Sequence, residues 1–94
     1  MNDVRLSGQL VCRDDAEVQL VKRLLAQHIT LTRSESGCAA FDVVQTSDPL
    51  VWQVDELFVD EVSFRAHQER AARSEWGIAT RAVERRFSIE GLSE

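Results

Sequence analysis

Apolar and polar side chains alternate along the first part of the chain. Over residues 4–12, one side of the pattern carries Val4, Leu6, Gly8, Leu10 and Cys12, and the other carries Arg5, Ser7 and Gln9. A period of two residues is typical of a strand with one buried face. The segments 38–46 and 50–58 are also rich in β-forming residues, and the turn residues Ser47-Asp48-Pro49 between them predict a hairpin. A fourth strand is expected over about 85–90.

Two stretches between these strands have helical spacing. Asp14 and Glu17 resemble a capping box, and apolar residues follow with the spacing of one helix face. We expect this helix to end near Ser36-Gly37, with Gly37 in the left-handed conformation. Asp60 is expected to cap a second helix that runs to about residue 72. A further helical stretch is expected over about 74–83, interrupted near Gly77.

The predicted order, β-α-β-β-α-β, is that of the ferredoxin-like α+β fold. This fold builds one antiparallel sheet with both helices on a single face. The other face would carry Ala40, Val44, Val51 and Leu57, a set too apolar to face water. We therefore expect a homodimer formed through this sheet face.

Composition limits the size and the partners of the protein. A chain of 94 residues and 10.6 kDa has the length of one domain, expected to span 1–94. Its net charge of −5 argues against nucleic acid or an anionic membrane as a partner. The N-terminus has no apolar signal-like stretch, and the sequence has no run long enough for a membrane helix, so we expect a cytoplasmic protein. Cys12 and Cys38 are too few for a disulfide framework and lack the CxxC spacing.

Two polar residues stand at apolar positions. On the strand 50–58, Glu56 projects to the same face as Trp52, Val54 and Phe58, where a carboxylate must be paired or protonated. His67 lies on the apolar side of the second helix, which the topology lays across that sheet face. A hydrogen bond between Glu56 and His67 would make the histidine a general base oriented by a carboxylate. A purely structural ion pair at Glu56 is also open from the pattern, and a lone histidine on such a face, as at His67, is more often a packed core residue than a catalyst.

Other candidates are aromatic or lack a partner. His28 lies on the core face of the first helix, as packing or as a pocket wall, and Phe41, Trp52 and Trp76 form either a pocket or simply core. The sequence has no dinucleotide, phosphate-loop, zinc-protease or nucleophile-elbow motif, and two distant histidines do not make a metal site. We therefore expect no metal and no cofactor.

Several segments, taken together, resemble the antibiotic biosynthesis monooxygenase (ABM) family. Thr32-Arg33-Ser34-Glu35-Ser36-Gly37-Cys38 is similar to its TRxExGC segment. Phe41-Asp42-Val43-Val44-Gln45 and Asp48-Pro49 resemble its second strand and hairpin turn. Trp52-Gln53-Val54-Asp55-Glu56-Leu57-Phe58 resembles its aromatic-x-x-x-Glu-x-aromatic strand, and Phe64-Arg65-Ala66-His67 its second-helix histidine. The ordered set covers residues 4–91.

The resemblance implies a dimeric α+β barrel that oxidises a quinol or another electron-rich aromatic with O2, without metal or flavin. It implies His67 as base or proton shuttle and Glu56 as its orienter. The substrate would contact the aromatic and histidine side chains of the pocket, namely Trp52, Phe58, Phe41, His28, Phe64 and Trp76.

The sequence departs from the family pattern at Phe58, where many members have tryptophan. Haem-degrading relatives use a strand-one asparagine, a second-helix tryptophan and a later histidine, none of which stands here, so haem degradation is not expected. Two alternatives stay open: an isomerase or lyase on a small oxygenated metabolite, as in relatives that process autoinducer-2, and a dimer that binds small molecules without converting them. The pattern also leaves open whether the arginines between 65 and 86 line a pocket mouth.

Overall fold

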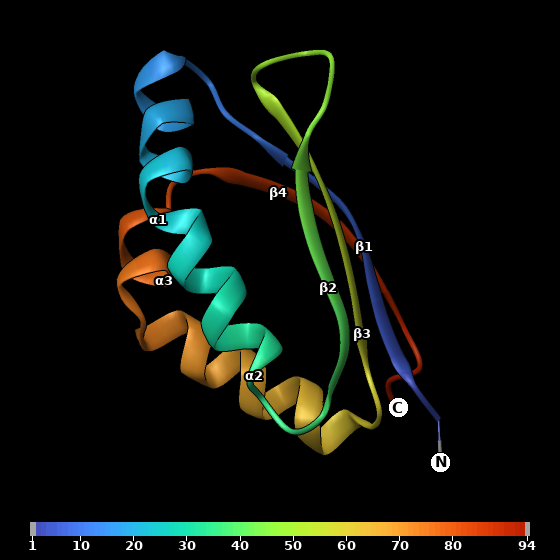
Figure 1. Ribbon diagram of the computed structural model, residues 1–94. Coiled ribbons are helices and arrows are strands. Elements are labelled where there is room, and N and C mark those ends of the chain that lie inside the picture. Colours follow the sequence, from blue (N-terminus) through green and yellow to red (C-terminus); the bar gives the residue numbers. More distant parts are fainter. Residues whose placement is uncertain (1, 94) are drawn as a thin grey trace.

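Four antiparallel strands form one sheet in the order β2-β3-β1-β4. The structure, a computed structural model, describes residues 2–93. Its strands and helices follow the predicted order, β1 (Val4–Val11), α1 (Asp15–Arg33), β2 (Cys38–Gln45), β3 (Val51–Phe58), α2 (Glu61–Arg73), α3 (Glu75–Ala79) and β4 (Glu84–Glu90). Figure 1 shows all three helices on the same face of the sheet. The ferredoxin-like α+β fold is thus confirmed.

The pleat of the strands separates a buried face from an open one. On β1, Val4, Leu6 and Leu10 point toward the helices and are almost fully buried. On β3, the inward positions are those expected from the sequence, and both Phe58 and Glu56 are buried there. The core lies between this face and the apolar side of α1, so any site on the inner face is enclosed by helices.

Both long helices begin at the predicted caps. Asp14 accepts a hydrogen bond from the backbone N–H of Glu17 at 3.0 Å, and the Glu17 carboxylate accepts one from the backbone of Arg13 at 2.9 Å. Asp60 accepts one from the backbone N–H of Ser63 at 2.8 Å. The bonds to Asp14 and Asp60 satisfy N–H groups that the first helical turn leaves without partners, and the bond to Glu17 joins the residue before the cap to the helix.

The end of α1 differs from the prediction. The helix ends at Arg33, and Gly37 does not have a positive φ. Gly37 is required for a different reason: a Cβ there would lie 2.0 Å from Ser63 Oγ and 2.2 Å from Ser63 Cβ. The glycine lets the loop before β2 pack directly on the first turn of α2.

A second difference from the prediction concerns Gly77. This residue lies inside α3 and does not interrupt the helix. A Cβ on Gly77 would lie 2.0 Å from the carbonyl oxygen of Ala71, so the glycine allows α3 to approach the end of α2. The helix ends at Ala79, earlier than the predicted 83, and a turn leads into β4.

The open face of the sheet is more polar than predicted. The expected apolar residues do lie on it, and Val44 is 61% exposed. Between them, however, Asp42 and Asp55 are cross-strand neighbours, and Ser7 Oγ donates to Asp55 at 2.9 Å. The face therefore has an apolar part on β2 and β3 that is divided by a polar row.

Two further expectations concern membrane-spanning helices and the cysteines. Within residues 2–93, no helix is both long and apolar enough to cross a membrane. Both cysteines are free thiols, and burial raises the pKa of Cys12 and of Cys38, which disfavours the nucleophilic thiolate.

The Gly37–Ser63 contact can be tested with a double-mutant cycle. Gly37→Ala should destabilise the protein by about 1–3 kcal/mol because the new methyl group overlaps the Ser63 side chain. Ser63→Gly removes those atoms, so Gly37→Ala should cost much less in that background. Urea unfolding of the four proteins measures the coupling. Additive effects would show that the contact does not determine the glycine.

Candidate functional site

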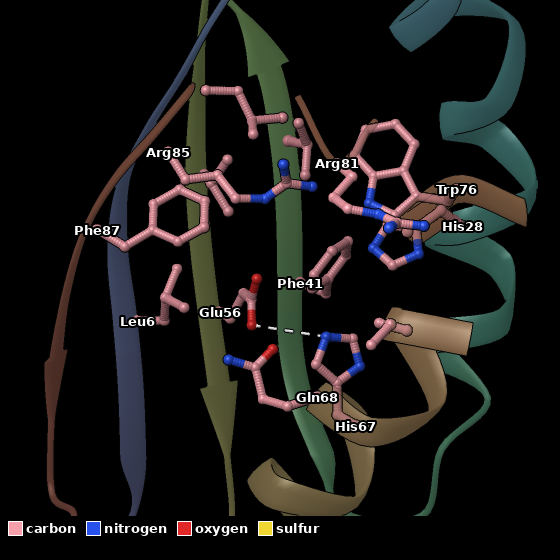
Figure 2. Close-up of a pocket in the computed structure, with 16 residues that line it drawn as sticks. Leu6, His28, Phe41, Glu56, His67, Gln68, Trp76, Arg81, Arg85 and Phe87 are labelled. Carbon is pink, nitrogen blue, oxygen red and sulfur yellow. Dashed lines mark ion pairs between the residues drawn. The ribbon is translucent and has the colours of Figure 1, made fainter. Parts of the chain in front are cut away.

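A cavity of about 300 Å³ lies between the inner face of the sheet and the helices (Figure 2). This volume is at the lower end of the range for small-molecule sites. Its walls are mostly apolar and aromatic, with a few polar groups directed inward, as is usual for such sites. The principal lining residues are Leu6, Leu10, His28, Phe41, Val43, Val54, Glu56, His67, Gln68, Ala71, Ala72, Trp76, Gly77, Arg81, Arg85 and Phe87.

His67 enters the cavity from α2 and is held by a carboxylate that the sequence analysis did not select. Its Nδ1 lies 2.9 Å from Glu35 Oε1, in the loop between α1 and β2. A carboxylate accepts hydrogen bonds, so this contact assigns the proton to Nδ1 and leaves Nε2 as the free acceptor of the neutral ring. The imidazole is therefore oriented with its lone pair toward the cavity.

Arg70 fixes Glu35 in turn. Its Nε donates to Glu35 Oε2 at 2.6 Å, and another of its nitrogens donates to Thr32 Oγ1 at 3.0 Å. His67 and Arg70 are three residues apart on α2, so both project from the same side of the helix. One carboxylate thus connects α1's end to α2 and positions the histidine.

Glu56 faces His67 across the cavity without a hydrogen bond. Its Oε1 lies 3.8 Å from His67 Nε2 (Figure 2), and this oxygen has no hydrogen-bond partner among the described residues. The predicted hydrogen bond between the two residues is therefore wrong, and so is Glu56 as the orienter of His67. The reason is that Glu35 already occupies Nδ1, and Nε2 remains beyond hydrogen-bond distance of the β3 carboxyl.

The two groups have opposite shifts of pKa. Burial, and then the nearby Glu35 charge, raise the pKa of Glu56 to about 7, although Arg85 acts in the other direction. Burial lowers the pKa of His67, against the opposing effect of Glu35. Near neutral pH the ring is thus a neutral base, and the facing carboxyl exchanges its proton over the same range.

His28 forms a wall of the cavity. Its ring stacks on Trp76 with centroids 4.7 Å apart and meets Phe41 edge-on at 5.3 Å. Burial lowers the pKa of His28 to about 3, with His67 adding to the effect, so this ring carries no charge at neutral pH. Its Nδ1 is buried without a hydrogen-bond partner.

The structure brings five of the eight sequence-selected residues to the cavity and leaves three behind its walls. Phe58 packs on the ring of His67 at 4.9 Å and on Phe64 at 5.8 Å, and neither phenylalanine lines the cavity. Trp52 is buried nearer the other end of β3. All inward residues of β3 share one face of the sheet. Those nearer the ends of the strand, Trp52 and Phe58, are covered by core packing, and those between them line the cavity. The residues that do line the cavity are Glu56, His67, Phe41, His28 and Trp76.

Several residues of the site were not selected from the sequence. Arg85 and Phe87 are two residues apart on β4, and this period-two spacing was a signal that both face inward. Glu35 stands within the quoted TRxExGC segment, but no local pattern relates it to His67. Gln68 and Arg81 come from α2 and from the turn after α3.

Comparison with known proteins places this geometry in a family. A sequence model described as "Antibiotic biosynthesis monooxygenase" matches residues 9–77, well over half of the chain. The chain belongs to the ABM family. The predicted family resemblance is therefore confirmed. A search of curated protein sequences gives no match.

Solved structures agree on the ABM fold. A protein from Nitrosomonas europaea, described as a candidate antibiotic biosynthesis monooxygenase, is similar with a TM-score of 0.82 and 19% identity, over 96% of this chain and 89% of that one. A similarly described protein from Deinococcus radiodurans has a TM-score of 0.74 and 19% identity, with 97% and 93% covered. A conserved protein from Methanosarcina mazei has a TM-score of 0.75 and 22% identity, over 99% of this chain and 95% of that one.

The raised pKa of Glu56 predicts a pH-dependent stability. The unfolded chain ionises this group near 4.5, whereas the folded protein keeps its proton until about 7, so the folded state binds more protons between these values. Stability of the wild type should therefore fall as pH rises through this window. The glutamine in Glu56→Gln does not titrate. Between pH 4 and pH 8, the free energy of unfolding of the variant should therefore rise by about 3 kcal/mol relative to that of the wild type.

Chemical denaturation at several pH values measures this difference. Glu69→Gln is a matched control, because Glu69 is an exposed glutamate of α2 that pairs with Arg73 outside the cavity. A gain independent of pH would mean that Glu56 titrates normally in the folded protein.

Proposed function

We propose that this ABM-family chain is a cofactor-independent monooxygenase for a quinol or another electron-rich aromatic. The observation that carries the proposal is the anchored His67. Its Nδ1–H is bound by the Glu35–Arg70 pair, and its free Nε2 faces a partly enclosed cavity with aromatic walls. Such a ring can accept a phenolic proton at neutral pH.

The reaction follows from that proton transfer. A hydroxyl of the substrate gives its proton to His67 Nε2, and the resulting oxyanion is electron-rich enough to reduce O2 directly. One oxygen atom enters the ring, the other leaves as water, and the two hydrogens of that water come from the substrate hydroxyl and the ring carbon. The substrate is thus both the electron donor and the oxygen acceptor, so the balance needs no further reductant.

Glu56 has a supporting role in this scheme. Its carboxyl faces the His67 ring, with Oε1 3.8 Å from Nε2. In its ionised form this carboxylate would stabilise the imidazolium formed by proton transfer. The mostly apolar walls around it lower the local dielectric constant and strengthen such an interaction. Phe41 and the stacked His28–Trp76 pair offer flat surfaces on which an aromatic ring can pack.

Oxygen uptake with a panel of hydroquinones, in metal-free buffer with chelator, tests the reaction. The wild type should consume O2 faster than the uncatalysed oxidation, and His67→Ala should lower kcat by about 10²–10⁴-fold because the base is lost. Glu35→Gln should shift the acid limb of the rate profile to lower pH, since Glu35 raises the pKa of His67. Glu69→Gln is the control variant and should retain activity. Absence of uptake with every quinol would reject the proposal.

One arrangement in the cavity favours a second candidate. Glu56 and His67 face each other as two groups that can exchange protons near neutral pH. Such a pair also suits an isomerase or lyase acting on a small oxygenated metabolite. Turnover without oxygen consumption would favour this function, and binding of aromatics without any conversion would favour a binding protein.

We also propose a homodimer formed through the open sheet face. Exposed Val44 and half-buried Val51 and Leu57 support it, as apolar residues that the helices do not cover. Sedimentation velocity should give a dimer for the wild type, and Val44→Asp should weaken it by placing a carboxylate beside Asp42 and Asp55. A monomeric wild type would contradict this.

A further inference from the structure

The mouth of the cavity carries two arginines that have no acidic partner within residues 2–93. Among the lining residues, the exposed ones include Gln68, Arg81 and Arg85, which identifies the opening of the cavity. Arg85 comes from β4, and Arg81 from the turn between α3 and β4. Figure 2 shows the Arg85 side chain extending from near Phe87 across the cavity, with its guanidinium above Glu56. Two cations therefore border this opening of the cavity.

Arg85 is held in place by neutral groups. One terminal nitrogen donates to the carbonyl oxygens of Thr80 and Val83 at 2.8 and 3.0 Å, and the other donates to Thr80 Oγ1 at 3.0 Å. Thr80 is fully buried and its own hydroxyl donates to the Trp76 carbonyl, so this support is rigid. A guanidinium has five N–H groups, and these bonds use three of them. The remaining two, Nε–H included, have no hydrogen-bond partner within residues 2–93 and could donate to a ligand.

Most other arginines of the protein are neutralised. Within residues 2–93, six have a carboxylate within 4 Å: Arg13, Arg33, Arg65, Arg70, Arg73 and Arg86. The chain has an excess of acidic residues, with a net charge of −5. Four arginines have no such ion pair in the described part of the chain, namely Arg5, Arg23, Arg81 and Arg85, and only the last two line the cavity. Their charges are left available at one place.

The cavity itself does not supply the missing negative charge. Glu56 is the one carboxylate among its principal lining residues, and it is partly protonated at neutral pH because burial raises its pKa to about 7. His28 and His67 are neutral rings under the same conditions. The site therefore has a positive mouth and a nearly uncharged interior, an arrangement that suits a ligand with an apolar ring and an anionic group at one end.

We propose that the substrate is an aromatic that carries a carboxylate, and that Arg81 and Arg85 bind this carboxylate at the mouth while the ring enters toward His67. The aromatic part of this assignment rests on the proposed function. A carboxylate is the group for which a fixed guanidinium has matching geometry, through paired N–H donors. The proposal makes Arg81 and Arg85 determinants of specificity for substrates of this class.

Binding of two matched ligands tests the charge requirement. The ligands are 2,5-dihydroxybenzoate and its methyl ester, which share the ring and the hydroxyls but differ in charge. Calorimetric titration without oxygen prevents turnover. The wild type should bind the carboxylate at least about 10-fold more tightly than the ester, as expected for hydrogen bonds to a charged group. The preference should decrease at high salt.

The variants identify the residues responsible. Arg81 forms no hydrogen bond within the described residues, so Arg81→Gln should fold normally and reduce the preference several-fold. Arg85→Gln should nearly abolish it, and Arg85→Lys should restore part of it. Arg86→Gln is the matched control, because Arg86 is the next residue on β4, points to the other face of the sheet and pairs with Glu84. It should retain the wild-type preference.

The inference would be overturned by equal affinity for acid and ester, or by no binding of the carboxylate. A preference that persists in Arg81→Gln and in folded Arg85 variants would also overturn it. Failure of this inference is distinct from failure of the proposed function. Oxygen uptake with neutral quinols and no charge preference would reject only the arginine site, whereas selective carboxylate binding without oxygen uptake would reject only the oxygenase.

Discussion

The hydrogen bond between Glu35 and His67 connects the parts of the molecule on which the site depends. Glu35 stands in the loop after α1, and His67 lies two helical turns into α2. The same carboxylate receives Arg70. Because a half-buried carboxylate with two hydrogen-bonded partners is held strongly, the loop, the helix and the imidazole adopt one arrangement. Gly37 contributes to this arrangement by letting the loop pack directly on Ser63.

The position of the site on the inner face of the sheet limits which ionisable groups can be charged there. The inner sheet face is apolar, so each ionisable group placed there changes its protonation or finds a partner. His67 remains neutral and gains Glu35, while Glu56 gains no hydrogen bond and holds its proton to a higher pH. His28 stays neutral in its stack with Trp76. The cavity thus combines a free base with weakly charged walls, which is the environment that proton removal from a bound hydroxyl requires.

The sheet explains why these groups meet. β1 lies in the middle, with β3 on one side and β4 on the other, so Glu56 and Arg85 project from neighbouring parts of one surface. The short helix α3 then brings Trp76 over α1 and places the following turn, with Arg81, beside the opening. Arg81 and Arg85 come from the segment after α3, whereas His67 comes from α2 and its partner Glu35 from the loop after α1. Under the proposed assignment, changes in β4 would alter specificity without disturbing His67.

The sequence by itself determined the features that depend on local periodicity. Alternation predicted the strands and the inward direction of Glu56, and helical spacing placed His28 and His67 on buried faces. The caps at Asp14 and Asp60 follow from short side chains beside free N–H groups. The ordered segments also indicated the ABM family. Each of these features depends on residues that are close together in the chain or on a pattern that repeats along it.

Only the tertiary structure decided which groups form the site. Glu35 and Arg70 are 35 residues apart, and no periodicity relates them. The local pattern at Gly37 suggested a helix cap, but contact with Ser63 on another element sets its requirement. Phe58 and Phe64 have the same buried character as Phe41, yet the closure of the sheet by helices decides that only Phe41 reaches the cavity. Distances between elements are set by packing in three dimensions. This packing gave His67 its partner and left Arg81 and Arg85 without a carboxylate partner in the described part of the chain.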